Sequence, residues 1–205
     1  LGRRPYLLTH GVDLETWTRE VQDAELEGIT ERTKELEKPW IVFWGSLDWR
    51  MDPHFVGALA NRLDQGTILF VGPVADCDPV LREFPRVVFF GRVPYRVLPW
   101  FAREAAVLIM PYRRGAGLEE LEPLKLREFL ITDRPVVVRD LPANRAWQDA
   151  LDLVDTAEEF AARVLQRIKE GAPPSQLAAR TRVQQEGWPA KARQFAAWLF
   201  PEASS

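Results

Sequence analysis

The chain has 205 residues, of which 46% are hydrophobic and 28% are charged, and its formal net charge is −3. This length and apolar content suffice for one cored domain with short appendages. Lys and Arg are scattered without a basic block, which argues against a nucleic-acid partner. The single cysteine, Cys77, excludes an internal disulfide and is typical of a reducing compartment.

The apolar runs are all shorter than the roughly 20 residues that span a bilayer, so we expect no transmembrane segment. We expect a cytoplasmic protein, and the sequence leaves open a peripheral position at the inner face of the membrane. The chain begins with Leu1 and not with methionine, and we therefore expect further sequence before it in the parent protein.

Short β-branched and aromatic runs alternate with helical stretches along the chain. The candidate strands lie at 40–44, 68–71, 87–90, 107–110, 136–138 and, as a short one, 151–154. These runs are continuously apolar and do not alternate with polar residues, which indicates strands buried on both faces. The pattern predicts an α/β fold: a doubly wound, Rossmann-like parallel sheet with helices on both faces. Trp44, the last residue of the first strand, is expected to pack in the core or at a domain interface.

Helix-start signals stand between these strands. Asp52-Pro53 and Asp78-Pro79 each provide an N-cap followed by proline in the first turn, and Thr156 with Glu159 forms a capping box. The charged segment 13–37 is expected to be a solvated helix or a linker. The remaining helices are expected at 53–64, 79–84, 94–104, from Pro123 onward, 157–169, 175–186 and 189–199.

Glycines follow the first three strands at Gly45, Gly72 and Gly91. In parallel sheets of this type, ligands bind outside the carboxyl ends of the strands. A single glycine there can be no more than a tight turn, but three at the same edge favour a close approach of backbone to a ligand.

The stretch EELEPLKLREFL, residues 119–130, carries the strongest indication of chemistry. Pro123 suits a first helical turn, so the amides of Leu124 and Lys125 are free at the positive end of a helix. With the charge of Lys125, this arrangement predicts an anion site suited to a diphosphate. Glu128 lies one turn further on, within reach of a ribose, and Glu120 precedes the helix. The alternative is that the acidic residues form a solvated loop that the helix dipole favours.

Glu120 and Glu128 resemble the E-x7-E arrangement of retaining, family-four-like glycosyltransferases of the GT-B fold. The segment PLKLREFLITDRPVVVRDLP, beginning at Pro123, resembles the segment of that family that runs from the helix into the next strand. Segments 38–60, 68–74 and 84–112 resemble the preceding parts of the same domain, in the same order. Residues 8–17 resemble its interdomain connection, and residues 187–199 resemble its terminal helix.

The resemblance implies the donor-binding half of a glycosyltransferase and a nucleotide-diphosphate sugar, UDP- or GDP-linked, as substrate. It implies that Glu128 binds the ribose, that the amides near Leu124 and Lys125 hold the diphosphate, and that Glu120 faces the donor sugar as the catalytic carboxylate. The resemblance also implies that the base of the nucleotide contacts the backbone around Arg92 and Val93. The phosphates would lie near Gly45, Ser46 and Arg50. It implies no metal and no further cofactor, and an acceptor that is unknown.

The same resemblance divides the chain into three parts. Residues 1–37 would be an interdomain connection with a leading helix, 38–172 the Rossmann-like domain that binds the nucleotide sugar, and 173–205 helices that pack toward an N-terminal acceptor domain missing from this chain. We expect the chain alone to bind nucleotide weakly and to be nearly inactive, because a GT-B site forms between two domains.

The chain also departs from the family's pattern. Ser46 and Arg50 stand where many relatives have arginine and lysine, and Leu121-Glu122-Pro123 replaces a Phe-Gly pair. These departures permit an alternative function, a catalytically silent nucleotide-binding or scaffold module of the same fold. Asp76-Cys77-Asp78 spells the D-x-D metal signature of another glycosyltransferase fold, but Asp78 is already expected to cap a helix. Without a G-x-G-x-x-G motif, a nicotinamide dehydrogenase is disfavoured.

Overall fold

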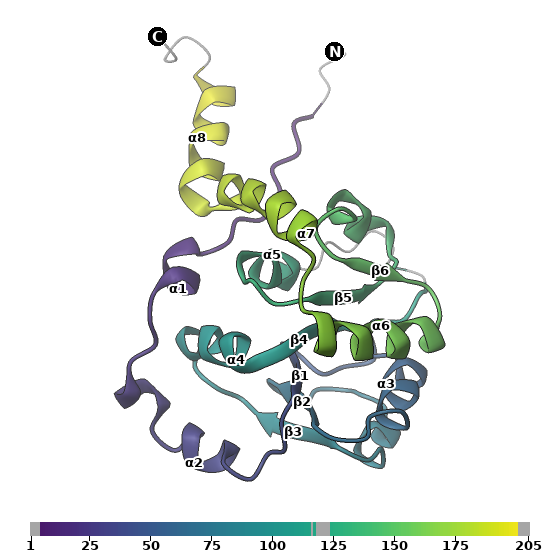
Figure 1. The fold of residues 1–205 in the computed structure, drawn as a ribbon. Coiled ribbons are helices and arrows are strands. Elements are labelled where there is room, and N and C mark those ends of the chain that lie inside the picture. Colours follow the sequence, from purple (N-terminus) through teal and green to yellow (C-terminus); the bar gives the residue numbers. More distant parts are fainter. Residues whose placement is uncertain (1–4, 116, 118–123, 201–205) are drawn as a thin grey trace.

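A six-stranded, fully parallel sheet forms the centre of the computed structural model, which describes residues 5–115, 117 and 124–200 (Figure 1). The strands are β1 (Trp40–Trp44), β2 (Thr67–Val71), β3 (Val87–Gly91), β4 (Ala105–Met110), β5 (Val136–Arg139) and β6 (Asp152–Val154). They lie in the order β3-β2-β1-β4-β5-β6. All six predicted strands and the parallel, doubly wound sheet are confirmed. Strands β1 and β2 are buried along their whole length, which is why their sequences are continuously apolar.

Helices cover both faces of this sheet (Figure 1). On one face α3 packs against α6, and on the other α1 contacts both α4 and α5. The helices are α1 (Leu14–Thr18), α2 (Ile29–Thr33), α3 (Pro53–Ala60), α4 (Leu98–Glu104), α5 (Leu124–Ile131), α6 (Ala157–Glu170), α7 (Pro174–Ala179) and α8 (Trp188–Leu199). The 3-10 helices are η1 (Asp23–Leu26), η2 (Pro79–Arg82), η3 (Tyr95–Val97), η4 (Pro142–Trp147) and η5 (Arg180–Glu186).

The predicted helix starts at Asp52, Asp78 and Thr156 are confirmed. The Asp52 carboxylate accepts a hydrogen bond from the His54 amide at 3.0 Å, and Asp78 accepts one from the Val80 amide at 3.1 Å. Three predicted helices have a different form: 79–84 is the short 3-10 helix η2, 94–104 divides into η3 and α4, and 175–186 divides into α7 and η5. The capping side chains are local, so the sequence identifies where a helix begins more reliably than how far it continues.

The leading segment was wrongly expected to be one solvated helix or a linker. It forms α1, η1 and α2, and its apolar side chains Trp17, Val21, Leu26 and Ile29 are buried in the core. Charged residues dominate this stretch in the sequence and conceal the widely spaced apolar residues that anchor it. The segment therefore belongs to the folded body, next to the carboxyl ends of the strands.

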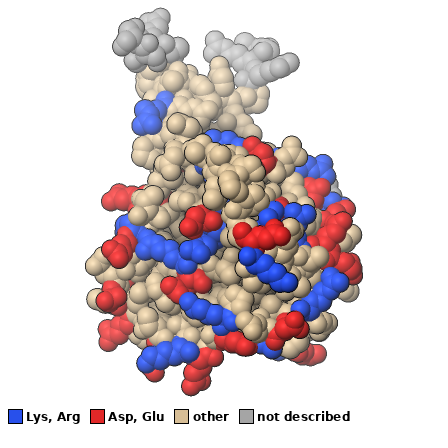
Figure 2. Space-filling model, in the orientation of Figure 1, with Lys and Arg blue, Asp and Glu red and all other residues tan. Residues whose placement is uncertain are grey.

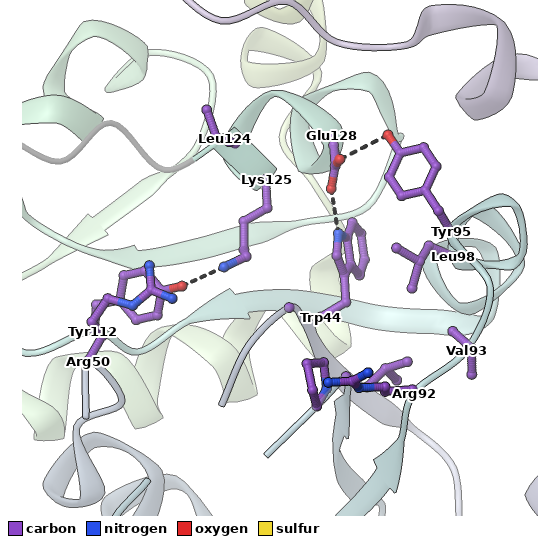
Figure 3. Close-up of a pocket in the computed structure, with 14 residues that line it drawn as sticks. Trp44, Arg50, Arg92, Val93, Tyr95, Leu98, Tyr112, Leu124, Lys125 and Glu128 are labelled. Carbon is purple, nitrogen blue, oxygen red and sulfur yellow. Dashed lines mark hydrogen bonds between the residues drawn. The ribbon is translucent and has the colours of Figure 1, made fainter. Parts of the chain in front are cut away.

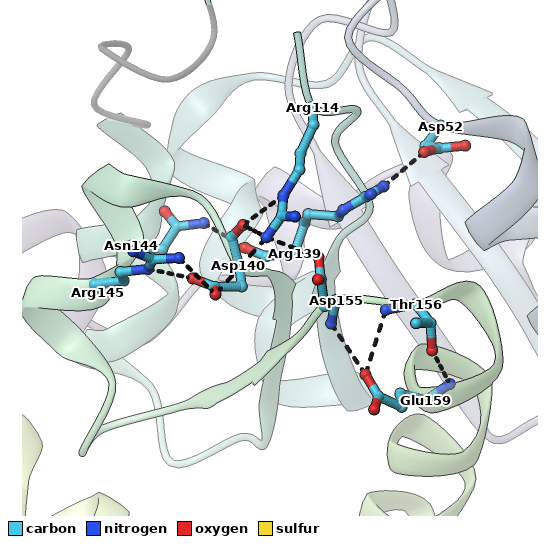
Figure 4. A network of polar contacts seen from close by, with 9 residues as sticks. All are labelled: Asp52, Arg114, Arg139, Asp140, Asn144, Arg145, Asp155, Thr156 and Glu159. Atoms are coloured by element: carbon cyan, nitrogen blue, oxygen red, sulfur yellow. Dashed lines mark hydrogen bonds and ion pairs between the residues drawn. The ribbon is translucent and has the colours of Figure 1, made fainter.

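An ion-pair network joins the loops that follow β4, β5 and β6 (Figure 4). Arg114 pairs with Asp155 at 2.7 Å and with Asp140 at 3.8 Å, and Arg145 pairs with Asp140 at 2.8 Å. These side chains are partly exposed, so each pair by itself contributes little to the stability of the fold. Their combined effect is to hold three neighbouring loops together at one edge of the sheet.

The two ends of the described chain leave the body side by side (Figure 1). Tyr6 stacks on Trp198 of α8 at 4.8 Å between ring centroids, and Lys191 donates a hydrogen bond to the Thr9 hydroxyl at 2.7 Å. Charged side chains of both signs spread over the rounded body in Figure 2, whereas the part that projects from it is mostly uncharged. Among the described residues, no helix combines the length and the apolar character needed to cross a membrane.

Two glycines bring the ends of β1 and β2 into direct contact. Gly45 has φ +129° and Gly72 has φ +147°, both in the region that side chains rarely adopt. A Cβ atom on Gly72 would lie 2.0 Å from the carbonyl oxygen of Gly45. Only glycine therefore fits at Gly72, because backbone and not a movable side chain occupies the space.

We expect Gly72→Ala to lower the free energy of unfolding by about 3 kcal/mol or more, since it adds a backbone clash to the cost of a strained φ. Gly28→Ala is the matched control, because Gly28 has φ +71° but nothing within 4 Å of its would-be Cβ. It should cost only about 1–2 kcal/mol. Urea unfolding of both variants measures the difference, and equal losses would contradict the clash.

Candidate functional site

A cavity of about 800 Å³ opens at the carboxyl ends of the strands, where the direction of winding reverses between β1 and β4 (Figure 3). This reversal point is the usual ligand position in doubly wound sheets. The lining residues end or follow one of the strands β1 to β4, begin α4, or lie on α5. They are Trp44, Gly45, Arg50, Val71, Gly72, Pro73, Arg92, Val93, Tyr95, Leu98, Tyr112, Leu124, Lys125 and Glu128. The cavity therefore collects chain segments that are far apart in the sequence.

Most of the predicted site residues meet in this cavity. Its lining includes Gly45, Arg50, Arg92, Val93, Leu124, Lys125 and Glu128. Ser46 is adjacent but does not line it, and its side chain hydrogen-bonds to Asp48. Glu120 and Pro123 lie outside the described residues, so the predicted catalytic carboxylate and the first helical turn stay predictions.

One face of α5 supplies two of the charged groups of the cavity, Lys125 and Glu128. Lys125 and Glu128 are three positions apart, and Leu124 and Glu128 are four apart, so all three project from the same side of the helix. The adjoining side carries Phe129 and Leu130, which are fully buried in the core. The apolar side anchors α5 against the sheet and thereby presents the charged side to the cavity.

Glu128 is held by two hydrogen-bond donors, as Figure 3 shows. The Trp44 indole nitrogen donates to Oε2 at 2.7 Å, and the Tyr95 hydroxyl donates to Oε1 at 2.9 Å. Burial raises the pKa of Glu128, while these two bonds and Lys125 act in the opposite direction. Each carboxylate oxygen has a second lone pair, so both oxygens can accept a further hydrogen bond from a ligand.

Lys125 points away from Glu128, toward Tyr112 (Figure 3). Its ammonium group donates a hydrogen bond to the Tyr112 hydroxyl and lies 4.8 Å from the centroid of the Phe43 ring. A Cβ atom on Gly45 would lie 2.7 Å from Nζ, so the glycine makes room for this side chain. Burial lowers the pKa of Lys125 to about 8, and nearby Arg50 contributes in the same direction. A bound anion would oppose both effects.

Arg50 brings a second cation to the cavity, but it is already paired. Its guanidinium donates to both oxygens of Asp48, at 2.8 and 2.6 Å, and lies 5.2 Å from the Tyr112 ring centroid. The pair leaves less free positive charge than the sequence suggests. Asp48, which the sequence reasoning did not single out, thus shapes the electrostatics of the site.

Three aromatic side chains at the site were not identified from the sequence. Trp44 is buried as expected, yet its indole nitrogen also binds Glu128. Tyr95 and Tyr112 follow β3 and β4 and contact the two charged residues of α5. Their position directly after buried strands was the one signal that could have revealed them, because those positions lie at the ligand-binding edge.

A second, smaller cavity of about 270 Å³ adjoins the first. It shares Tyr95, Leu124 and Glu128 with the main cavity, and its other side is formed by 10–13 and Trp188. Glu128 therefore stands between the sheet edge and the two segments that lead to the projecting ends. Within the described residues, no group of three or more His, Cys, Asp or Glu side chains is placed to bind a metal ion.

Comparison with known proteins yields similar folds and one related sequence. No protein-family model matches the chain. Over 110 residues, 52% of the chain, it is 30% identical to the Bacillus subtilis protein TuaH, named as a teichuronic acid biosynthesis glycosyltransferase. That match covers 28% of TuaH, so the chain spans only about a quarter of this curated relative.

Solved glycosyltransferase structures share the architecture. The Anabaena protein HepE in complex with UDP has a TM-score of 0.69 at 14% identity, covering 92% of this chain and 55% of HepE. HepE has also been solved with UDP-glucose, at a TM-score of 0.67. Sucrose-phosphate synthase from Thermosynechococcus elongatus has a TM-score of 0.67 at 21% identity, covering 98% of this chain and 53% of the synthase.

The chain thus spans about half of each of these structures, and at such identities the likeness concerns the fold alone. The sheet order, the helices on both faces and the cavity at the reversal point all agree with this likeness. The chain has the Rossmann-like fold of one half of a GT-B glycosyltransferase.

Proposed function

We propose that the chain is the donor-binding half of a glycosyltransferase and binds a nucleotide-diphosphate sugar. The observation that carries this proposal is the pair of opposite charges on α5, Lys125 and Glu128, which project into a cavity at the reversal point of the sheet. A ribose diphosphate needs an acceptor for its hydroxyls and a cation for its phosphates, side by side. The HepE complexes with UDP and UDP-glucose support a nucleotide sugar as ligand.

In the proposed complex the ligand extends along the carboxyl ends of the strands. The ribose hydroxyls would hydrogen-bond to the free lone pairs of Glu128. The diphosphate would lie beside the Lys125 ammonium group, which rests against Gly45, and close to the amino end of α5. The base would lie against the end of β3, near Arg92 and Val93, where the cavity lining is largely apolar.

We further propose transfer with retention of configuration and without a metal ion. The bond between the anomeric carbon and the diphosphate oxygen breaks, and an acceptor hydroxyl attacks the same face of the sugar. Its proton passes to the departing diphosphate. Lys125 would stabilise the negative charge that develops on the leaving group. Glu120 would face the sugar and stabilise the positive charge at the anomeric carbon.

The projecting part of the chain suits the contact with a second domain. The exposed apolar side chains there are Tyr6, Leu7, Trp188, Phe195, Leu199 and Phe200, each with at least 49% of its surface exposed. Clustered apolar side chains of this kind mark interaction surfaces. An N-terminal acceptor domain that packs on this surface would close the cavity from the side of the second, smaller cavity.

A catalytically silent nucleotide-binding module remains the second candidate function. The observation that favours it is the Arg50–Asp48 ion pair, which compensates a cation expected to hold the phosphates. A protein of this kind would bind nucleotide through Glu128 and Lys125 but would not transfer sugar.

Glu120→Gln in the longer parent protein separates the two functions. A transferase should lose about a hundredfold or more in sugar transfer while its affinity for the nucleotide stays within about twofold, because the carboxylate acts on the reacting carbon. The measurement is release of nucleoside diphosphate from the sugar donor with Glu120→Asp alongside. Activity that is absent in the unmodified parent would support the silent module.

Glu128→Gln tests the proposed ribose contact directly. Glutamine has one oxygen and one NH₂ group where glutamate has two acceptor oxygens. The NH₂ group cannot accept the hydrogen bond that Trp44 or Tyr95 donates at that position. We expect UDP or GDP to bind at least about tenfold more weakly, since a hydrogen bond to a charged group contributes about 1.5–3 kcal/mol. Isothermal titration calorimetry on the 205-residue chain provides the measurement. Absence of binding of UDP, GDP and ADP to the unmodified chain at millimolar concentration would refute the site.

Lys125→Met should remove nucleotide binding without lowering thermal stability. The folded-state pKa of Lys125, about 8, lies below its unfolded value, so the buried charge opposes folding at neutral pH. Methionine keeps the aliphatic contacts and removes this charge. Isothermal titration calorimetry measures nucleotide binding, and differential scanning fluorimetry on the same sample measures the unfolding temperature. A lower unfolding temperature would show that the variant loses folding and not only binding.

The same pKa predicts how affinity depends on pH. Lys125 is mostly charged at pH 7.0 and mostly neutral at pH 8.5 in the free protein, so affinity for UDP should fall about fourfold between them. Lys125→Arg is the control, because arginine stays charged and should show no such fall. A fall of equal size in Lys125→Arg would assign the effect to another group or to the nucleotide.

A further inference from the structure

A chain of hydrogen bonds connects the leading segment to the candidate ribose-binding carboxylate. The Trp17 indole nitrogen donates to the Tyr95 hydroxyl at 2.7 Å, and that hydroxyl donates to Glu128 Oε1 at 2.9 Å. The Trp44 indole nitrogen reaches the other oxygen, Oε2, at 2.7 Å. Three separate elements, α1, β1 and η3, thus converge on one side chain of α5.

Stacked rings keep these donors in place. Trp17 is 5% exposed and lies on Trp44 with 5.1 Å between ring centroids and 23° between planes. Trp44 in turn meets the edge of Phe129, on the core side of α5, at 4.4 Å. Neither indole can turn its N–H away from its acceptor without breaking these contacts. The direction of both bonds to Glu128 is therefore built into the packing.

The chemistry of the donors also determines where the protons lie. An indole N–H can only donate, so the Tyr95 oxygen accepts from Trp17 and directs its single proton to Glu128. Both oxygens of Glu128 thereby receive a donor from the protein, an arrangement that favours the ionised, acceptor-only carboxylate. Lys125 of the same helix adds a favourable charge. The lone pairs left over can accept only from a ligand that donates, as ribose hydroxyls do.

We propose that Trp17, Tyr95 and Trp44 are positioning residues that hold Glu128 in the orientation and the charge state that select ribonucleotides over 2′-deoxyribonucleotides. This inference rests on the proposed function and adds to it the determinant of sugar selectivity. A fixed carboxylate matches the 2′-hydroxyl, and a 2′-deoxy ligand leaves a buried acceptor unmatched. A loosely held carboxylate turns to other partners and discriminates less.

Tyr95→Phe is the most informative variant. It removes only the hydroxyl, and the ring is 44% exposed, so the fold should tolerate it. The experiment measures the dissociation constants of UDP, 2′-deoxy-UDP, GDP and 2′-deoxy-GDP by calorimetry on the 205-residue chain, and compares the ribo and deoxy forms of the nucleotide that binds more tightly. We expect the unmodified chain to prefer the ribonucleotide by about tenfold or more, and Tyr95→Phe to reduce this preference to about threefold or less.

Trp17→Phe provides an independent second variant, because it keeps an aromatic ring in the stack and removes the N–H that orients the Tyr95 hydroxyl. It should also reduce the preference, although Trp17 does not line the cavity. Tyr112→Phe is the matched control within the cavity: it removes a hydroxyl that contacts Lys125 and should change the affinity for both forms by the same factor.

The outcomes distinguish the assignment of sugar selectivity from the proposed nucleotide site. A reduced preference in Tyr95→Phe and Trp17→Phe, with an unchanged preference in Tyr112→Phe, supports the assignment. An unchanged preference in both Tyr95→Phe and Trp17→Phe overturns it and leaves the nucleotide site intact. If the unmodified chain binds neither nucleotide at millimolar concentration, the proposed function is refuted and the inference with it.

Discussion

Two opposite, partly buried charges on one side of a short helix are the feature on which the rest of the site depends. Removing a carboxylate and an ammonium group from water opposes folding, and each needs partners near it. Glu128 has the donors of Trp44 and Tyr95, and Lys125 has the Tyr112 hydroxyl and the faces of two aromatic rings. The cavity is thus lined by groups that compensate the charges partially, and a ligand with hydroxyls and phosphates would complete the compensation. Partly compensated charges lower the stability of the folded chain, and such a loss of stability is typical of a binding site.

The backbone around these charges is as constrained as the side chains. Gly45 and Gly72 let the ends of β1 and β2 touch, and the missing side chain at Gly45 leaves the space into which Lys125 bends. The result is a smooth surface at the reversal point of the sheet, beside the amino end of α5. In a parallel sheet this is where strand ends and a helix end are brought closest, so a small number of residues can present both amides and charges to one ligand.

The core side of α5 connects the site to the projecting ends. Arg127, which is 4% exposed, pairs with Glu186 at 2.7 Å, and Glu186 also pairs with Lys191 of α8 at 2.8 Å. Lys191 reaches Thr9 in the leading segment. The helix that carries Lys125 and Glu128 is therefore attached to both segments that would meet a second domain. A movement of those segments would act on α5 directly, through buried charge pairs that are costly to break.

The sequence by itself determined the six strands, the parallel sheet and the helix caps, and it predicted the edge at which a ligand would bind. These features depend on local hydrogen bonds and on the burial of continuous apolar runs, which neighbouring residues encode. Only the tertiary structure decided that the leading segment is packed into the body and that Arg50 is paired with Asp48. It alone also revealed that Trp44 and Tyr95 bind Glu128 and that Trp17 binds Tyr95 behind it. Those contacts join residues 33 to 84 positions apart, and such pairings follow from the way the elements pack and not from any local pattern.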